Sequence, residues 1–277
     1  MHSLVIKNPF GGPVYYIESC TSTMDFSKEL AKKGEVPGTV IVTGFQESGR
    51  GRNNRTWFSE KECNLLFTLM MLYEDFYSMP SVFTLKAGLA LVLALETIFP
   101  LLAGRIKIKW PNDIMIDGKK AAGILTETVH VSPGSAVVET GSGIISGTEV
   151  YLGMGINIGQ KNFPPELADT ATSLAKTDSA STDKLNFESG NALLEKILFC
   201  LFNEFNFAEY SGTWKNRLEQ KLFKINEEVY FIKGQADSGN FIKGIITGVD
   251  DQGFLSLVPC GECNALFFNT GEITLKI

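Results

Sequence analysis

Short apolar runs separated by polar, glycine-containing segments follow one another through the first half of the chain. Because these runs are rich in β-branched side chains, they predict strands. The expected strands are residues 14–17, 39–45, 64–72, 106–110, 114–116, 122–128 and 151–158. Stretches with helical length and apolar spacing predict three helices, one capped by Ser22 or Thr23 and ending at Gly34, and two at residues 81–99 and 193–205.

The pattern changes at about Asn226, where short alternating strands separated by turns begin. The expected strands are residues 229–232, 241–249, 254–258, 265–268 and 273–277, with a strong turn at residues 250–253. Strands that follow a mixed body predict an α+β protein with a small C-terminal β-barrel. We therefore expect two domains, residues 1–224 and 225–277, and a polar surface loop at residues 164–182.

Length and composition limit the class of protein. The chain has 277 residues, of which 44% are hydrophobic and 20% charged, which is enough for a sizeable core and argues against disorder. The net charge of −6 argues against a surface that grips nucleic-acid phosphates, so no DNA partner is expected. The most apolar stretch, residues 87–95, is too short to cross about 30 Å of hydrocarbon, so we expect no membrane partner.

The cysteines indicate a reducing compartment. There are five, an odd number, at irregular spacing, and the N-terminal residues do not have the pattern of a signal peptide. We therefore expect reduced thiols and a cytoplasmic protein.

Several kinds of chemistry are excluded by what the sequence lacks. His2 and His130 are the only histidines, which leaves little for a Ser-His-Asp or histidine-rich metal site. The Cys260-x-x-Cys263 pair has no partner pair at zinc-ribbon spacing, so two turn cysteines are favoured over a zinc site. No P-loop pattern is present.

Three clusters stand out, and the first is the loop at residues 49–55, GRGRNNR, which directly follows a predicted strand. Glycines let backbone amides approach an anion, and three arginines add forked donors that suit phosphate. A phosphate-binding loop and a solvated basic surface loop are about equally consistent with this cluster alone.

The second cluster is residues 109–113, KWPND, followed by Lys120 beyond an Asp117-Gly118 turn. A hairpin would return Lys120 to the same end of the sheet as Asp113. The lysine could serve a negatively charged acyl phosphate and the carboxylate a metal, although a plain hairpin with an exposed lysine tip explains the same residues.

The third cluster is residues 153–159, GMGINIG, at the end of a predicted strand. Its spacing differs from that of a dinucleotide-binding motif. The glycines would instead allow close packing against a ligand or against a neighbouring strand.

Taken in order, these clusters resemble the biotin–protein ligase family over about residues 13 to 277. The resemblance rests on Ser22-Thr23, Gln46 with GRGRNNR and Trp57, KWPND with the KAAGIL segment at residues 120–125, GMGIN at residues 153–157, and ATSL at residues 171–174. It implies a mixed sheet with flanking helices, as in class II synthetases, and a C-terminal SH3-like barrel. It also implies the ATP-dependent formation of biotinyl-5′-AMP and the transfer of biotin to a lysine of a biotin carboxyl carrier protein.

The resemblance assigns roles to individual residues. Those implied to bind biotin are Ser22, Thr23, Gln46, Gly49, Arg50, Trp57, Lys120, Gly123 and Gly153. Those implied to bind the nucleotide are Arg50, Arg52, Arg55, Asn112, Asp113 and Asn157. Lys120, Arg50 and Asp113 are the implied catalytic residues, with Asp113 also a ligand of Mg²⁺.

The resemblance leaves alternatives and departures. A lipoate–protein ligase would share the architecture, although its Arg-Arg, Gly-Gly-Gly and His-Asp motifs are missing here, and a non-catalytic biotin-binding module is a second alternative. Asn54 stands where glycine is usual, and Met24 where asparagine is common, which argues against a polar role there. Because Ser22 comes so early, we expect the monofunctional type without an N-terminal DNA-binding domain. A homodimer is compatible with this interpretation.

Overall fold

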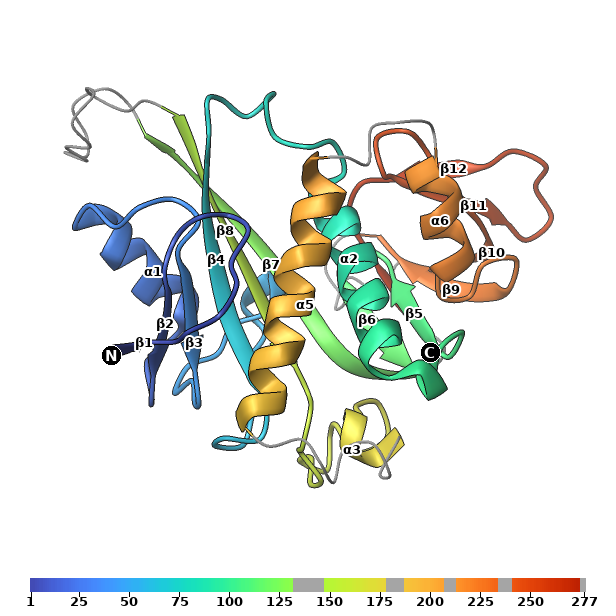
Figure 1. The fold of residues 1–277 in the computed structure, drawn as a ribbon. Helices are drawn as coiled ribbons and strands as arrows, with labels where there is room; N and C mark the ends of the chain where they lie inside the picture. The colour runs from blue at the N-terminus through green and yellow to red at the C-terminus, as the bar shows by residue number, and fades with distance from the viewer. Residues whose placement is uncertain (132–146, 178–186, 207–212, 234–240, 275–277) are drawn as a thin grey trace.

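A mixed eight-stranded sheet forms the body of the molecule (Figure 1). The computed structural model describes residues 1–131, 147–177, 187–206, 213–233 and 241–274. The strand order is β1-β2-β3-β4-β8-β7-β6-β5, and β2 and β3 are the parallel pair. The strands are β1 (His2–Ser3), β2 (Val14–Ile17), β3 (Val40–Thr43), β4 (Leu65–Tyr73), β5 (Ile106–Lys109), β6 (Asp113–Ile116), β7 (Lys119–Val131) and β8 (Gly147–Ile156).

Two long helices cover one face of this sheet (Figure 1). They are α2 (Phe83–Ile98) and α5 (Phe187–Asn206), which pack against each other, with the rings of Phe83 and Phe205 stacked at 4.4 Å. Alternate side chains of β4, such as Phe67 and Leu69, join them in the main core. Because side chains alternate along a strand, the intervening residues of β4 and β8 face the other way.

The opposite face carries much less cover. The helix α1 (Thr23–Lys32) packs there on β3, β4 and β8, where Met24 and Ala31 contact Met70 and Tyr151. Towards β7 and β6 this face has small residues instead, since Gly123 of β7 pairs with Gly155 of β8. The sheet therefore offers an open surface beside α1, and we call it the open face.

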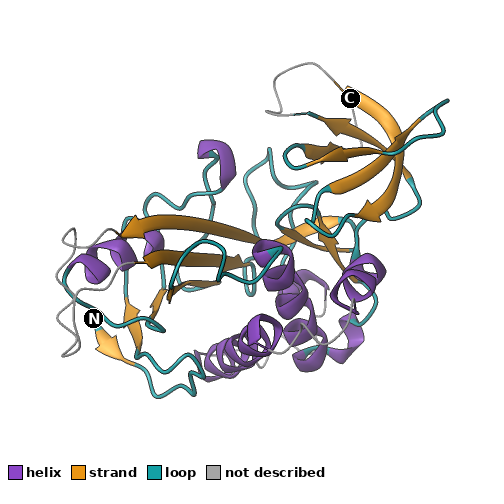
Figure 2. Ribbon diagram, turned by 90° about the horizontal axis from the view of Figure 1, so that it is seen from above, coloured by secondary structure: helices purple, strands orange, loops and turns teal. Residues whose placement is uncertain are grey.

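The C-terminal strands form a second, antiparallel sheet at one end of the molecule (Figure 2). Its strands are β9 (Glu228–Ile232), β10 (Phe241–Val249), β11 (Leu255–Pro259), β12 (Leu266–Phe268) and β13 (Glu272–Thr274), in the order β12-β11-β10-β9-β13. A small SH3-like β module is therefore confirmed, but the expectation of a closed barrel was wrong for the described strands. β12 pairs with β11 and β13 with β9, and these two edge strands, each three residues long, share no ladder.

The second sheet is anchored to the body through Trp110. Its indole Nε1 donates a hydrogen bond to the carbonyl of Gly253 at 2.9 Å, and its ring lies 6.2 Å from that of Phe231. The backbone amide of Phe223 also donates to the carbonyl of Ile108 at 2.8 Å. These contacts hold the C-terminal sheet against the hairpin of β5 and β6.

The remaining elements are short. The helix α6 (Thr213–Lys221) joins the two sheets, α3 (Leu174–Thr177) lies in the predicted loop at 164–182, and the 3-10 turns are η1 (Arg52–Asn54) and η2 (Pro100–Leu102). The sequence did not predict α6. Only one of the apolar side chains of this helix, Leu218, is buried. The part of the loop beyond residue 177 lies outside the described residues. Within the described chain, no helix combines the length and the apolar character needed to cross a membrane.

Candidate active site

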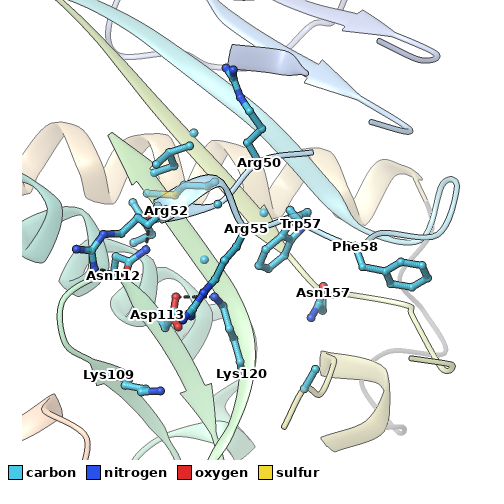
Figure 3. A pocket seen from close by; sticks show the side chains of 18 of the residues that line it. Arg50, Arg52, Arg55, Trp57, Phe58, Lys109, Asn112, Asp113, Lys120 and Asn157 are labelled. Carbon is cyan, nitrogen blue, oxygen red and sulfur yellow. Dashed lines mark hydrogen bonds and ion pairs between the residues drawn. The ribbon is translucent and has the colours of Figure 1, made fainter. Parts of the chain in front are cut away.

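A cavity of about 580 Å³ opens on the open face of the sheet (Figure 3). Its walls come from the start of α1, the arginine loop (residues 49–55), the β6–β7 hairpin, β8, the loop before α3 and β13. We call one end the amide end, formed by Ser22, Thr23, Gln46 and Thr68, and the other the cationic end, formed by Arg52, Arg55 and Lys109.

The amide end is built by the first turn of α1. Ser22 caps the helix, with its hydroxyl accepting a hydrogen bond from the amide of Met24 at 3.3 Å. The amide and hydroxyl of Thr23 both donate to Oε1 of Gln46, at 2.9 and 3.1 Å, and Thr68 donates to Thr23 at 2.8 Å. These hydrogen bonds fix the carboxamide of Gln46 and leave its NH₂ group available to a ligand.

An apolar wall adjoins the amide end. Met24 is 3% exposed, and a Cβ on Gly153 would lie 2.9 Å from its methyl carbon. Leu125 packs against the same cluster. An unsubstituted Gly153 therefore makes room for Met24, which agrees with an apolar rather than a polar role at position 24.

The indole of Trp57 lies over the two paired glycines of β7 and β8. A Cβ on Gly155 would come within 2.6 Å of this ring, and one on Gly123 within 2.9 Å. The amide of Trp57 donates to the carbonyl of Gly49 at 2.8 Å, which closes the arginine loop as a hairpin. The glycines do allow close packing, but their partner is the indole of Trp57, just after the arginine loop, rather than the expected ligand or neighbouring strand.

Lys120 and Asp113 meet in the middle of the cavity, as the hairpin predicted. The ammonium nitrogen of Lys120 lies 2.7 Å from Oδ1 of Asp113 and 5.4 Å from the centroid of the Trp57 ring (Figure 3). The turn between them has positive φ at Asp117 and Gly118, 50° and 80°. Oδ1 of Asp113 is buried, and the ammonium of Lys120 is its close partner among the described residues.

Two asparagines hold the walls of the site. The amide of Asn112 donates to the carbonyl of Ile124 at 2.8 Å, and its oxygen accepts from Arg52 at 3.3 Å. Nδ2 of Asn157 donates to the carbonyl of Thr172 at 3.0 Å, which ties the end of β8 to the ATSL segment. Oδ1 of Asn157 is buried without a hydrogen-bond partner among the described residues, so it can accept a bond from a ligand.

The cationic end is partly withdrawn from water. Burial lowers the pKa of Lys109 and of Arg52 below the ordinary values of these groups. Glu272 of β13 accepts two hydrogen bonds from Arg55, at 3.1 and 2.6 Å, and lies 3.9 Å from Lys109. Burial raises the pKa of Glu272, but the hydrogen bond from Arg55 and the charges of Lys109 and Arg55 lower it more, so its carboxylate stays ionised.

Arg50 has a different orientation from the other arginines of the loop. Its guanidinium pairs with Asp25 at 2.5 Å and lies 4.0 Å from Glu127, and it points away from Lys120 (Figure 3). Arg52 and Arg55 are the arginines that face the cationic end. The residue of the loop with a left-handed backbone is Asn53, with φ of 54°.

The cavity brings together most of the residues that the sequence indicated. Those that line it are Ser22, Thr23, Gln46, Arg50, Arg52, Arg55, Trp57, Asn112, Asp113, Lys120, Gly123, Gly153 and Asn157. Gly49 lies behind the wall, where a Cβ would come within 2.8 Å of the carbonyl of Trp57. Lining residues that the sequence did not indicate include Thr68 and Glu272. Lys109 also lines the cavity, and the sequence placed it in the KWPND cluster without giving it a role.

The arrangement can bind an anion and stabilise developing negative charge, but it lacks a nucleophile with a histidine base. His130, Cys260 and Cys263 are all exposed and do not line the cavity. No group of three or more His, Cys, Asp or Glu side chains suited to a metal ion occurs in the described residues. A cation here would therefore need a ligand's own oxygens in addition to Asp113.

Comparisons with known proteins agree with this geometry. Residues 16–141 match the profile of the Biotin/lipoate A/B protein ligase family. The chain is 29% identical over 249 residues to the bifunctional ligase/repressor BirA of Bacillus subtilis, covering 89% of this chain and 70% of that protein. It is 26% identical to the biotin--[acetyl-CoA-carboxylase] ligase of Mycobacterium tuberculosis, covering 86% and 79%. The biotin protein ligase of Aquifex aeolicus, solved in complex with biotin and ATP, superimposes with a TM-score of 0.70 at 25% identity, covering 95% of this chain and 98% of that one.

Proposed function

Because this chain belongs to the biotin/lipoate A/B protein ligase family, we propose that it is a biotin–protein ligase. In the first step a biotin carboxylate oxygen attacks the α-phosphorus of ATP, and the bond to the β-phosphate oxygen breaks to release pyrophosphate. In the second step the amine of a carrier lysine attacks the acyl carbon of biotinyl-5′-AMP. An amide bond forms, the amine loses a proton, and AMP leaves.

The observation that carries the proposal is the continuity of one cavity from the amide end to the cationic end, with Lys120 and Asp113 between them. A ligand with a polar ring at one end and a phosphate at the other fits this distribution of donors. A simple capture site for a neutral ring would need neither Lys120 nor the arginine loop.

At the amide end, the ring of biotin is the proposed ligand. The NH₂ of Gln46 can donate a hydrogen bond to a ureido group, and the Ser22 hydroxyl can donate or accept one. Thr23 keeps Gln46 in place through its two hydrogen bonds. Met24 and the space over Gly153 would contact the apolar part of the ring. Gly49 acts indirectly in this proposal, by allowing the loop to pack on Trp57.

At the cationic end, the phosphates and the ribose are the proposed ligands. Arg52 and Arg55 present forked donors there, and Asn157 offers its unpartnered oxygen to a ribose hydroxyl. Arg50 pairs with Asp25 at the rim in this structure, so its proposed role requires it to leave that contact when the adenylate is present.

Lys120 is the proposed centre of catalysis. Its ammonium lies where the carboxylate of biotin and the α-phosphate would meet, and it would offset the negative charge that grows in the transition state. Trp57 covers this point and excludes water, which would otherwise hydrolyse the mixed anhydride. The side chains bind and orient both substrates, so positioning and electrostatics supply the rate.

Mg²⁺ is the proposed metal, and the residues fit it. Asp113 presents a buried carboxylate whose Oδ1 pairs with Lys120 in this structure, and Mg²⁺ is commonly held by one or two carboxylates together with substrate phosphates. When bound, the ion would neutralise phosphate charge. Asn112 would keep the wall beside Asp113 in place through its bond to Ile124.

The acceptor in this proposal is a biotin carboxyl carrier domain. The division into residues 1–224 and 225–277, the cytoplasmic location and the absence of DNA binding remain predictions. A homodimer also remains a prediction.

Biotin-dependent exchange of pyrophosphate into ATP tests the proposal, with lipoate as the parallel substrate. We expect exchange with biotin alone. Exchange with lipoate would make the protein a lipoate ligase, and no exchange with either compound would favour a non-catalytic biotin-binding module. Transfer of biotin to a purified carrier domain then tests the second step.

A further inference from the structure

The C-terminal sheet contributes one carboxylate, Glu272, to the wall of the cavity. Glu272 begins β13, which pairs with β9 so that Glu272 lies opposite Ile232 and Ile273 opposite Phe231. Gly271 precedes it with φ of 148°, and a Cβ there would lie 2.2 Å from the Phe231 ring. The position of Glu272 is therefore set by the core of the C-terminal sheet.

That core is itself fixed to the hairpin that carries Asp113. Trp110 bonds to Gly253 and packs on Phe231, the same side chain that Gly271 touches. Glu272 thus reaches the cavity from a rigid support.

Three contacts pin the arginine loop to its surroundings. Arg50 pairs with Asp25 of α1, Arg52 bonds to Asn112, and Arg55 pairs with Glu272. The Arg55 contact is the one with two hydrogen bonds to a carboxylate, a geometry that fixes direction as well as distance. It is also the one that joins the loop to the other sheet.

Because Arg55 is held in place, the position of Trp57, whose ring covers Lys120, is restrained as well. The carbonyl of Arg55 accepts a hydrogen bond from the amide of Gly51 at 2.7 Å, and Trp57 follows two residues later. Holding Arg55 therefore holds the hairpin and the indole over Lys120.

We propose, on the basis of the function above, that Glu272 is a positioning residue that latches the arginine loop shut through Arg55 and so retains the acyl-adenylate. The C-terminal sheet thereby becomes part of the adenylation site. Glu272 itself would not touch the reacting atoms. Its ionised state at neutral pH keeps the latch available whenever the nucleotide is bound.

The experiment compares Glu272→Gln with wild type in the full-length protein. Biotinyl-5′-AMP is formed on the enzyme from labelled biotin, and its release is followed after addition of unlabelled compound. We expect release to be about two- to fivefold faster in Glu272→Gln, the range for a partly exposed ion pair. The affinity for biotin without ATP should stay the same, and Glu272→Asp should restore part of the retention.

Two further variants separate a latch from a general effect. Glu228→Gln removes an ion pair with Lys243, 2.8 Å long and outside the cavity, and should leave release unchanged. In an Arg55→Gln background, Glu272→Gln should have little additional effect, since the contact with Arg55 is already lost and only the longer pair with Lys109, at 3.9 Å, remains.

The outcomes are separable. Unchanged release from Glu272→Gln, or effects of Arg55→Gln and Glu272→Gln that simply add, would overturn the latch. Equal acceleration by Glu228→Gln would assign the effect to the stability of the sheet and would also overturn it. If wild type forms no biotinyl-5′-AMP, the proposed function fails first.

Discussion

Gly155 lies directly beneath the indole of Trp57, so Gly155→Ala tests whether that ring sets the geometry of the cavity. The added Cβ would lie 2.6, 2.7 and 2.8 Å from three atoms of the indole. To reach ordinary contact the nearest of these distances must grow from 2.6 to at least 3.4 Å. The ring cannot simply shift sideways on the sheet, because it already lies over the paired Gly123 as well.

The expected cost has two parts. Overpacking a well-filled site typically lowers the free energy of unfolding by about 1–3 kcal/mol. The ring also has to lift away from Lys120, whose ammonium lies 5.4 Å from its centroid, and it pulls on the hydrogen bond between Trp57 and Gly49. Because a displacement of about 1 Å can cost about 100-fold in rate, we expect adenylate formation to fall by about 10- to 100-fold.

Biotin-dependent pyrophosphate exchange measures this loss, and thermal unfolding measures the stability. Gly190→Ala is the matched control, since a Cβ there meets nothing within 4 Å and lies in α5. In a Trp57→Phe background, Gly155→Ala should cost much less, because the smaller ring leaves space. Wild-type exchange by Gly155→Ala, or the same loss in both backgrounds, would refute the reasoning.

Three more predictions concern the charged groups. Lys120→Ala should lower exchange by at least about 100-fold without loss of folding, and normal pyrophosphate release would contradict its assigned role. Chelation by EDTA should abolish exchange and Mg²⁺ restore it, with Asp113→Asn needing more Mg²⁺; metal-independent exchange would argue against this site. Burial lowers the pKa of Lys109 in the folded protein below its ordinary value of 10.5, so the unfolded chain binds more protons at this residue. The free energy of unfolding therefore decreases as the pH falls from 10.5 towards the folded-state pKa. Lys109→Met should therefore unfold at a higher temperature at neutral pH, and an equal or lower midpoint would count against it.

Local patterns were enough to predict most of the elements and part of the lining of the cavity. The β-branched runs identified the body strands, and the Asp117-Gly118 turn correctly brought Lys120 back to Asp113. These inferences succeed because a hairpin and a capped helix are determined by neighbouring residues. The helix α6 was not predicted, because its burial depends on the elements packed around it rather than on its own pattern of apolar residues.

The orientations of the three arginines could not be predicted, because partners distant in sequence decide them. Arg50 is drawn to Asp25 on α1, and Arg55 to Glu272, which lies 217 residues further along the chain. The sequence assigned all three arginines to the nucleotide, and Arg50 also to biotin and catalysis, but it did not predict their partners within the protein. The structure separates them into one at the rim and two at the cationic end.

The acidic charge of the whole chain and the cationic character of the cavity arise from different requirements. A net charge of −6 argues against a broad phosphate-binding surface, yet Arg52, Arg55, Lys109 and Lys120 converge where Asp113 and Glu272 only partly offset them. Burial disfavours the charge of Lys109 and Arg52, so this end of the cavity is maintained at a cost to stability. Buried cations of this kind are expected where an anionic ligand supplies the missing countercharge. The positive charges are thus confined to a cavity the size of a small ligand, although the chain as a whole is acidic.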